Sequence, residues 1–182
     1  MIHTRYMYWI EWRESAVILR ALMDGRNMTV IIQNHTVVMR PRALVIDYLE
    51  NMIYWTDERH GSIYRARSDG TGLESVVLQH LPHPYCVTQY KDFIFWGDHD
   101  DNTISRANKL NGGNRTMIEA NIGYIMDVKV FHGTRQVGWN DCGIGNGGCS
   151  HLCIPLPGKK HTCACPNHFS LDEEKNTTCI GK

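Results

Sequence analysis

Tyr54-Trp55-Thr56-Asp57, at residues 54–57, is one of three copies of a single pattern in this chain. An aromatic residue, a tryptophan, any residue and an acidic residue also occupy positions 8–11 and 95–98. The three tryptophans, Trp9, Trp55 and Trp96, lie 46 and 41 residues apart. A period of this length indicates a structural unit that repeats along the chain.

The residues that follow each copy are also alike. An apolar-x-Arg-Ala core comes next, at residues 18–21, 63–66 and 104–107. An Asp-Gly or Asn-Gly pair follows at residues 24–25, 69–70 and 111–112, and then a short β-branched run at residues 29–32, 76–78 and 117–118. Asp-Gly and Asn-Gly suit hairpin turns because these residues tolerate positive φ. Several short strands per unit, without helical periodicity, predict an all-β fold made of propeller blades.

A further strand is predicted ahead of the second and third copies, at residues 43–48 and 86–90, each introduced by a proline (Pro41 and Pro84). Residues 124–131 have the same character, but no further tryptophan motif follows them. We therefore expect 124–131 to be the first strand of a repeat whose remainder is absent. In a ring, such a strand completes a blade begun by the other terminus and removes a free sheet edge.

The composition excludes some classes of function. The chain has 182 residues with 19 basic and 19 acidic side chains, so its net charge is zero and a broad nucleic-acid-binding face is not expected. No stretch approaches the ~20 apolar residues that span a bilayer, so direct membrane insertion is not expected. The first twenty residues contain Arg5, Glu11, Arg13 and Glu14 and do not resemble a signal peptide.

Six of the seven cysteines crowd into the C-terminal part of the chain, and Cys86 stands alone upstream. Such density predicts a small domain held by disulfides in an oxidising compartment. A zinc site is the alternative, but the gaps of 6, 3, 9, 1 and 13 residues do not fit paired Cys-x2-Cys or Cys-x4-Cys ligands. Cys86 is expected to be a small buried residue, with a pairing to a missing blade as the alternative.

Four glycosylation sequons support secretion. Their asparagines are Asn27, Asn34, Asn114 and Asn176. Chance would supply about one in a chain of this composition. Because no signal peptide is evident, residue 1 is not expected to be the start of the mature product.

These motifs together resemble the low-density-lipoprotein-receptor family. The resemblance rests on the aromatic-Trp-x-acidic repeats and on residues 146–153 (NGGCSHLC) and 163–166 (CACP). Residues 81–90 and 126–132 are most similar to the third propeller–EGF unit of the Wnt co-receptors, the group that includes Arrow. The family unit is a six-bladed YWTD propeller followed by an EGF-like module.

The resemblance implies a division into two domains. Residues 1–136 would be the C-terminal half of a YWTD propeller, with about three of six blades, and residues 137–182 an EGF-like domain, so the chain is expected to be a fragment. It also implies the disulfides Cys142–Cys153, Cys149–Cys163 and Cys165–Cys179. The acidic and Asn positions of calcium-binding EGF modules are not matched, so neither a metal nor a cofactor is expected.

Equivalent repeat positions lie at equal height around a ring, and here they hold residue types enriched at interface centres. The resemblance implies that these positions engage extracellular protein ligands. The predicted ligand-binding residues are Trp12, Arg40, His83, Tyr85, His99, Tyr124 and Met126. His99 stands where the Wnt co-receptors have Trp, and Arg59 where an acidic residue is expected.

The predicted function is ligand binding by the ectodomain of a single-pass Wnt co-receptor at the extracellular side of the plasma membrane, with secreted Wnts or their antagonists as partners. One alternative is an endocytic lipoprotein-type receptor that releases ligand at low pH, with His83 and His99 as the candidate sensors. Another is a matrix protein of the nidogen kind. Catalysis is not expected: Asp98-His99-Asp100-Asp101 has residue types suited to a metal or acid/base site, but a polar turn after a strand explains it as well.

Overall fold

The computed structural model describes residues 6–12, 14–33, 36–78, 81–133, 140–158 and 160–181. The chain divides into two compact units, a larger one built from Tyr8–Leu19 and Val30–Arg135 and a smaller one that contains the cysteine-rich C-terminal part. Within the described ranges the only helices are two short 3-10 turns, η1 (Asp141–Gly143) and η2 (Gly145–Gly148). None of the described helices has the length and apolar character needed to cross a membrane.

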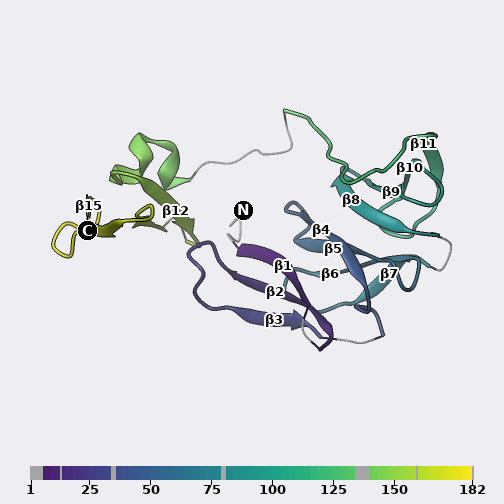
Figure 1. Ribbon diagram of the computed structural model, residues 1–182, viewed down its shortest axis with the longest axis horizontal. Coiled ribbons are helices and arrows are strands. Elements are labelled where there is room, and N and C mark those ends of the chain that lie inside the picture. Colours follow the sequence, from purple (N-terminus) through teal and green to yellow (C-terminus); the bar gives the residue numbers. More distant parts are fainter. Residues whose placement is uncertain are drawn as a thin grey trace. The chain divides into compact units, whose positions relative to one another are not determined.

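Three small sheets, in each of which strands that follow one another in the sequence lie side by side, succeed one another along the chain (Figure 1). We call them the first, second and third blades. The first blade contains β1 (Tyr6–Trp12), β2 (Ala16–Leu22) and β3 (Thr29–Ile32). The second contains β4 (Pro41–Asp47), β5 (Met52–Asp57), β6 (Ser62–Arg67) and β7 (Glu74–Val77). The third contains β8 (Pro84–Tyr90), β9 (Phe93–Asp98), β10 (Thr103–Asn108) and β11 (Thr116–Glu119). The prediction of an all-β fold with propeller blades is confirmed.

The tryptophan motif holds neighbouring blades together. Successive side chains of a strand point to opposite faces, so β5 sends Trp55 into the core shared with the first blade and Tyr54 into the core shared with the third. Trp55 stacks on Tyr64 with ring centroids 5.8 Å apart and donates from Nε1 to the Val37 carbonyl at 3.0 Å. Trp96 of β9 fills the equivalent position against the second blade. Trp55, Trp96 and Tyr54 are fully buried, and the burial of large aromatic side chains stabilises this packing.

The prediction of a closing strand at residues 124–131 is wrong. Residues 120–132 form no strand, although Ile125 is buried against Gly97 of β9. A strand requires a neighbour whose backbone N–H and C=O groups pair with its own. No described strand lies beside 124–131 to supply those groups. The apolar pattern therefore places the segment against the third blade without making it part of a sheet.

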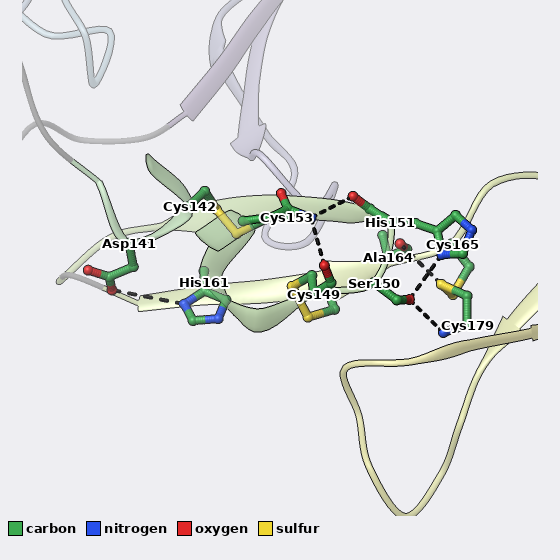
Figure 2. The surroundings of a disulfide bond; sticks show 12 residues. Asp141, Cys142, Cys149, Ser150, His151, Cys153, His161, Ala164, Cys165 and Cys179 are labelled. Atoms are coloured by element: carbon green, nitrogen blue, oxygen red, sulfur yellow. Dashed lines mark hydrogen bonds and ion pairs between the residues drawn. A yellow bond between two sulfur atoms is a disulfide. The ribbon is translucent and has the colours of Figure 1, made fainter. Parts of the chain in front are cut away.

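The cysteine-rich part consists of two small hairpins held by three disulfides. β12 (Leu152–Leu156) pairs with β13 (Lys160–Ala164), and β14 (Phe169–Leu171) pairs with β15 (Cys179–Gly181). The disulfides join Cys142 to Cys153, Cys149 to Cys163 and Cys165 to Cys179, which are the pairs that the family resemblance implies. Figure 2 shows Ser150 next to Cys179, whose backbone N–H it accepts at 2.8 Å. The expected boundary between residues 136 and 137 lies outside the described residues and stays a prediction.

Candidate functional site

The acidic residue of each motif organises one edge of its blade. Asp57 ends β5 directly opposite Pro41, and its Oδ2 accepts the backbone N–H groups of Met39 at 2.7 Å and Arg40 at 2.9 Å. Asp98 ends β9 opposite Pro84 and accepts the backbone N–H of His83 in the same way. Both carboxylates are buried, and hydrogen bonds to a charged group are stronger than neutral ones. The motif carboxylate thus fixes the backbone of Arg40 directly before β4 and that of His83 directly before β8.

Glu58 is the centre of a charged cluster at this edge. Its carboxylate lies 3.3 Å from Nη1 of Arg40 and 3.5 Å from Nε2 of His83, and it also accepts a hydrogen bond from Nε of Arg42. Burial alone would raise the pKa of Glu58, but the hydrogen bond and the charge of Arg42 outweigh that effect. The pKa of Glu58 is consequently held below its ordinary value, and the carboxylate is ionised at neutral pH.

A stack of rings continues the cluster onto the third blade. Tyr85 stacks on His99 with centroids 4.0 Å apart and an interplanar angle of 14°, and the guanidinium of Arg42 lies 5.6 Å from the Tyr85 ring centroid. The centroid of His83 is 5.1 Å from that of His99. A cation over an aromatic face is attracted by the ring quadrupole, so Arg42 joins the charged cluster to the stack.

The chain after the third blade adds an exposed aromatic residue. His99 Nε2 lies 2.7 Å from the Ile125 carbonyl oxygen, and the Tyr124 ring stands edge-on to His99 at 6.4 Å. Tyr124 is 87% exposed and adopts the left-handed conformation with φ of 49°. An aromatic ring that is anchored at its base and open to solvent is well suited to enter a partner's pocket.

Five of the seven predicted ligand-binding residues are brought together in this way. They are Arg40, His83, Tyr85, His99 and Tyr124. Met126 is 62% exposed two residues after Tyr124, and Trp12 is 56% exposed at the end of β1. In the described part of the chain, no ring contact, hydrogen bond or ion pair joins Trp12 to the others.

Two residues of this cluster were not among the predicted ligand contacts, although they occupy the same repeat positions. Glu58 stands three residues after its motif tryptophan, as His99 does, and Arg42 stands two after Arg40, as Tyr85 does after His83. The signal that could have identified them is opposite charge at repeat positions that meet at one blade edge. We call the residues Arg40, Arg42, Glu58, His83, Tyr85, His99 and Tyr124 the upper cluster.

Three groups of residues have the chemical types of a metal or catalytic site, but their contacts do not favour such a role. Asp98 Oδ1 accepts the backbone N–H groups of Asp100 at 3.1 Å and Asp101 at 3.2 Å, which is the hydrogen bonding of a turn. Cys149, Cys153 and His161 lie close enough to hold a metal ion, but both sulfur atoms belong to disulfides and offer no thiolate. Cys86 is free and buried, and burial raises the pKa of its thiol, so a nucleophilic thiolate is disfavoured.

The described sequon asparagines all lie on the surface. Asn27, Asn114 and Asn176 are exposed residues of turns, and Asn34 lies outside the described residues.

Comparison with known proteins places these features in context. Residues 5–48 match the family described as low-density lipoprotein receptor repeat class B, and residues 142–179 match the coagulation factor Xa inhibitory site family. Low-density lipoprotein receptor-related protein 5 of Homo sapiens is 43% identical over 162 residues, which is 88% of this chain and 10% of the relative. The Mus musculus protein of the same name is 42% identical over the same shares. The chain thus spans about a tenth of the length of the curated relatives it matches.

Among solved structures, the crystal structure of a nidogen/laminin complex contains a similar chain. The TM-score is 0.61 and the sequence identity 24%, with 70% of this chain and 48% of that chain covered. At this identity the likeness concerns the fold alone.

Proposed function

This chain belongs to the low-density lipoprotein receptor family, and from this premise we propose that it binds secreted protein ligands as part of the extracellular portion of a cell-surface receptor. The observation that carries the proposal is the upper cluster, in which an ionised carboxylate and two arginines support a ring stack that ends in exposed Tyr124. Tyr, Arg, Trp and Met are the residue types enriched at interface centres. The proposal includes no catalytic activity.

More narrowly, we propose a Wnt co-receptor whose partners are Wnts or their antagonists. Support comes from the 43% identity to the receptor-related relative and from the resemblance of residues 81–90 and 126–132 to Wnt co-receptors. Both of these stretches contribute to the upper cluster or continue directly from it, through His83, Tyr85 and Tyr124. Under this proposal, the ligand contacts would lie in or next to the two stretches that resemble Wnt co-receptors.

Alanine substitution tests this face with a matched control. We expect Tyr124→Ala to weaken binding of purified Wnt antagonists, measured by biolayer interferometry, by about tenfold or more, because a central aromatic anchor is removed. Tyr85→Ala is expected to weaken binding to a similar degree, because it removes the ring on which His99 stacks and over which the Arg42 guanidinium lies. Tyr48→Ala is the control, since Tyr48 is another exposed tyrosine but follows the opposite end of the second blade's inner strand.

The thermal midpoint of each variant separates binding from folding. Tyr124 is almost fully exposed, so Tyr124→Ala should leave the midpoint unchanged. Equal loss of affinity for Tyr48→Ala and Tyr124→Ala, or a large fall in the midpoint for both cluster variants, would contradict the proposed face.

A second candidate is an endocytic receptor that releases ligand in acidic compartments. The observation that favours it is the pair His83 and His99, with Glu58 and Asp100 near His83 at 3.5 and 3.3 Å. Protonation of His83 would put a third cation beside Glu58, in competition with Arg40 and Arg42. Binding of the same antagonists at neutral and mildly acidic pH, with His83→Gln and His99→Gln, distinguishes this candidate: loss of affinity in acid that the variants abolish supports release.

A further inference from the structure

Glycine is an unusual residue for position 97, which lies within β9. The second blade has Thr56 at the same motif position, and Thr56 Oγ1 accepts the backbone N–H of Ala43 at 3.2 Å. A glycine within a strand lowers stability, because it loses more conformational freedom on folding and has no side chain to pack. The φ of Gly97 lies outside the left-handed region that favours glycine, so the backbone conformation does not require it. The missing side chain therefore points to a close neighbour.

The chain that follows the third blade fills the space where a side chain of Gly97 would lie. A Cβ on Gly97 would be 2.6 Å from Cγ2 of Ile125 and 2.7 Å from Sγ of Cys86, closer than real Cβ atoms approach other atoms. Ile125 and Cys86 are both buried. Glycine in a strand often marks such a close approach. We call this space, bounded by Gly97 and Cys86 and occupied by Ile125, the Gly97 gap.

The Gly97 gap lies next to the exposed tyrosine of the upper cluster. The Ile125 carbonyl oxygen is 2.7 Å from Nε2 of His99, two residues after Gly97. Tyr124 has φ of 49°, which a bulky residue rarely adopts and keeps only where surrounding contacts enforce it. Because residues 120–132 form no strand, a sheet does not hold Tyr124 in place. Its neighbour Ile125 supplies two contacts that can do so, the buried side chain and the carbonyl oxygen at His99.

We propose that Gly97 is a positioning residue for the ligand-binding face: its missing side chain makes room for Ile125, and Ile125 in turn holds Tyr124 in the upper cluster. The role in binding rests on the proposed function, whereas the filling of the gap does not. A methyl group at residue 97 would displace Ile125 rather than the paired strands β8 and β9, because residues 120–132 have no sheet pairing to lose. Tyr124 would then leave its position beside His99 while the blades stay folded.

Thiol labelling tests the Gly97 gap without any ligand. Cys86 is the free cysteine among the described residues, and its sulfur borders the space that Ile125 fills. We expect Gly97→Ala to raise severalfold the rate at which a maleimide labels Cys86 in the folded chain, because the displaced segment uncovers the sulfur. Gly123→Ala is the matched control, since it adds the same methyl group one residue before Tyr124, where a Cβ would meet nothing within 4 Å. Equal labelling rates for Gly97→Ala and the native chain would overturn the proposal.

A double-mutant cycle tests whether Gly97 acts through Tyr124. Gly97→Ala should weaken binding of a purified Wnt antagonist by about tenfold, as Tyr124→Ala does, and should lower affinity little further when residue 124 is already alanine. Gly123→Ala should bind like the native chain. A full further loss from Gly97→Ala in the Tyr124→Ala background would overturn the positioning role, because it would reveal a general disturbance of the third blade. If Tyr124→Ala alone leaves binding unchanged, the proposed binding face fails and Gly97 has no role in binding, whereas the labelling rates still decide whether Ile125 fills the gap.

Ile125→Ala keeps the test decisive even where Gly97→Ala does not fold. This change removes the group that fills the Gly97 gap and adds no clash, so labelling of Cys86 should be faster and binding weaker than in the native chain. Gly97→Ala should also speed labelling less in the Ile125→Ala background, because its methyl group then meets no Cγ2. Fluorescence of the buried Trp55 and Trp96 checks that the blades of each variant are folded. Native labelling rates in folded Ile125→Ala would refute the proposal.

Discussion

The glycines of the three Asp-Gly and Asn-Gly turns have the same conformation but different surroundings. Gly25, Gly70 and Gly112 have φ of 84°, 90° and 66°. A Cβ on Gly70 would lie 2.1 Å from the Ile31 carbonyl oxygen, and one on Gly112 would lie 2.1 Å from the Val76 carbonyl oxygen. A Cβ on Gly25 would meet nothing within 4 Å. Two of the three turns therefore need glycine both for φ and for close contact with a neighbouring outer strand.

Alanine substitution separates these two requirements. Gly25→Ala should lower the free energy of unfolding by about 1–2 kcal/mol, the cost of the left-handed conformation alone. Gly70→Ala should lower it by roughly 3 kcal/mol or more, because the backbone of Ile31 cannot move aside as a flexible side chain would. Urea denaturation followed by tryptophan fluorescence measures both values. Equal effects would mean that the blade contact at Gly70 contributes nothing beyond backbone strain.

At the scale of elements, one buried ion pair joins the second and third blades. Nζ of Lys109, just after β10, lies 2.6 Å from Oδ2 of Asp47 at the end of β4 and 2.8 Å from Oε1 of Glu50. Lys109 and Asp47 are both buried. Burial alone would lower the pKa of Lys109, but the hydrogen bonds to the two carboxylates outweigh it and raise the pKa above its ordinary value. The charged form of the lysine is therefore favoured between the blades.

Replacing Lys109 alone should lower the free energy of unfolding more than replacing both Lys109 and Asp47 with uncharged side chains. Lys109→Met is expected to lower the free energy of unfolding by about 3–5 kcal/mol, because it leaves the buried Asp47 carboxylate without a cation. Adding Asp47→Asn should recover part of that loss, since an asparagine oxygen can still accept the N–H groups of Leu49 and Glu50 that Asp47 Oδ1 accepts now. A double variant as unstable as Lys109→Met alone would contradict the account.

Because the pKa of Lys109 is raised in the folded state, its contribution to the free energy of unfolding depends on pH. A raised pKa means that the folded state binds the proton more tightly, so the lysine's contribution is fully present below its unfolded pKa, near 10.5. It is lost as the pH rises through the folded value above 10.5. The stability difference between the native chain and Lys109→Met should therefore be constant at neutral pH and narrow in strongly alkaline solution. A difference that narrows near neutrality would point to another group.

At the scale of the whole molecule, repetition made the blades predictable. Trp55 and Trp96 each lie in an apolar core between blades, and the motif that contains them recurs in the sequence at intervals of 46 and 41 residues. The prediction of a closing strand at residues 124–131 failed because a strand needs a neighbour to pair with. Residues 124–131 have no such neighbour among the described strands. Such a dependence cannot be read from the segment itself.

The candidate site was predictable in position but not in detail. Repeat positions located five residues of the upper cluster, because equivalent positions meet at one blade edge. That Glu58 lies at its centre depends on which way its own side chain and those of the arginines turn. The pairing of Lys109 with Asp47, 62 residues apart, has no signal in local pattern, since only blade packing brings them together.

The cysteine-rich part differs from the blades in how it is held together, and this leads to the last prediction. Among described residues 140–158 and 160–181, Cys149 alone is buried, so this part has almost no apolar core. Its three disulfides each close a loop with a sequence separation of 11 or 14 residues, for which chain entropy contributes about 3 kcal/mol per bridge. The blades contain no disulfide among the described cysteines, since Cys86 is free. Their buried Trp55 and Trp96 hold them by packing.

A reductant should therefore unfold the two parts unequally. We expect hydrogen exchange, measured by mass spectrometry after disulfide reduction, to show lost protection in peptides covering β12 and β13. Peptides covering β5 and β6 should keep their protection at the same reductant concentration, because their hydrogen bonds and apolar contacts involve no bridge. Cys86→Ser provides a control for thiol chemistry in the blades and should not alter this pattern. Loss of protection in β5 and β6 together with β12 and β13 would mean that the blades depend on the bridged part for their own stability, and that the two do not fold as separate domains.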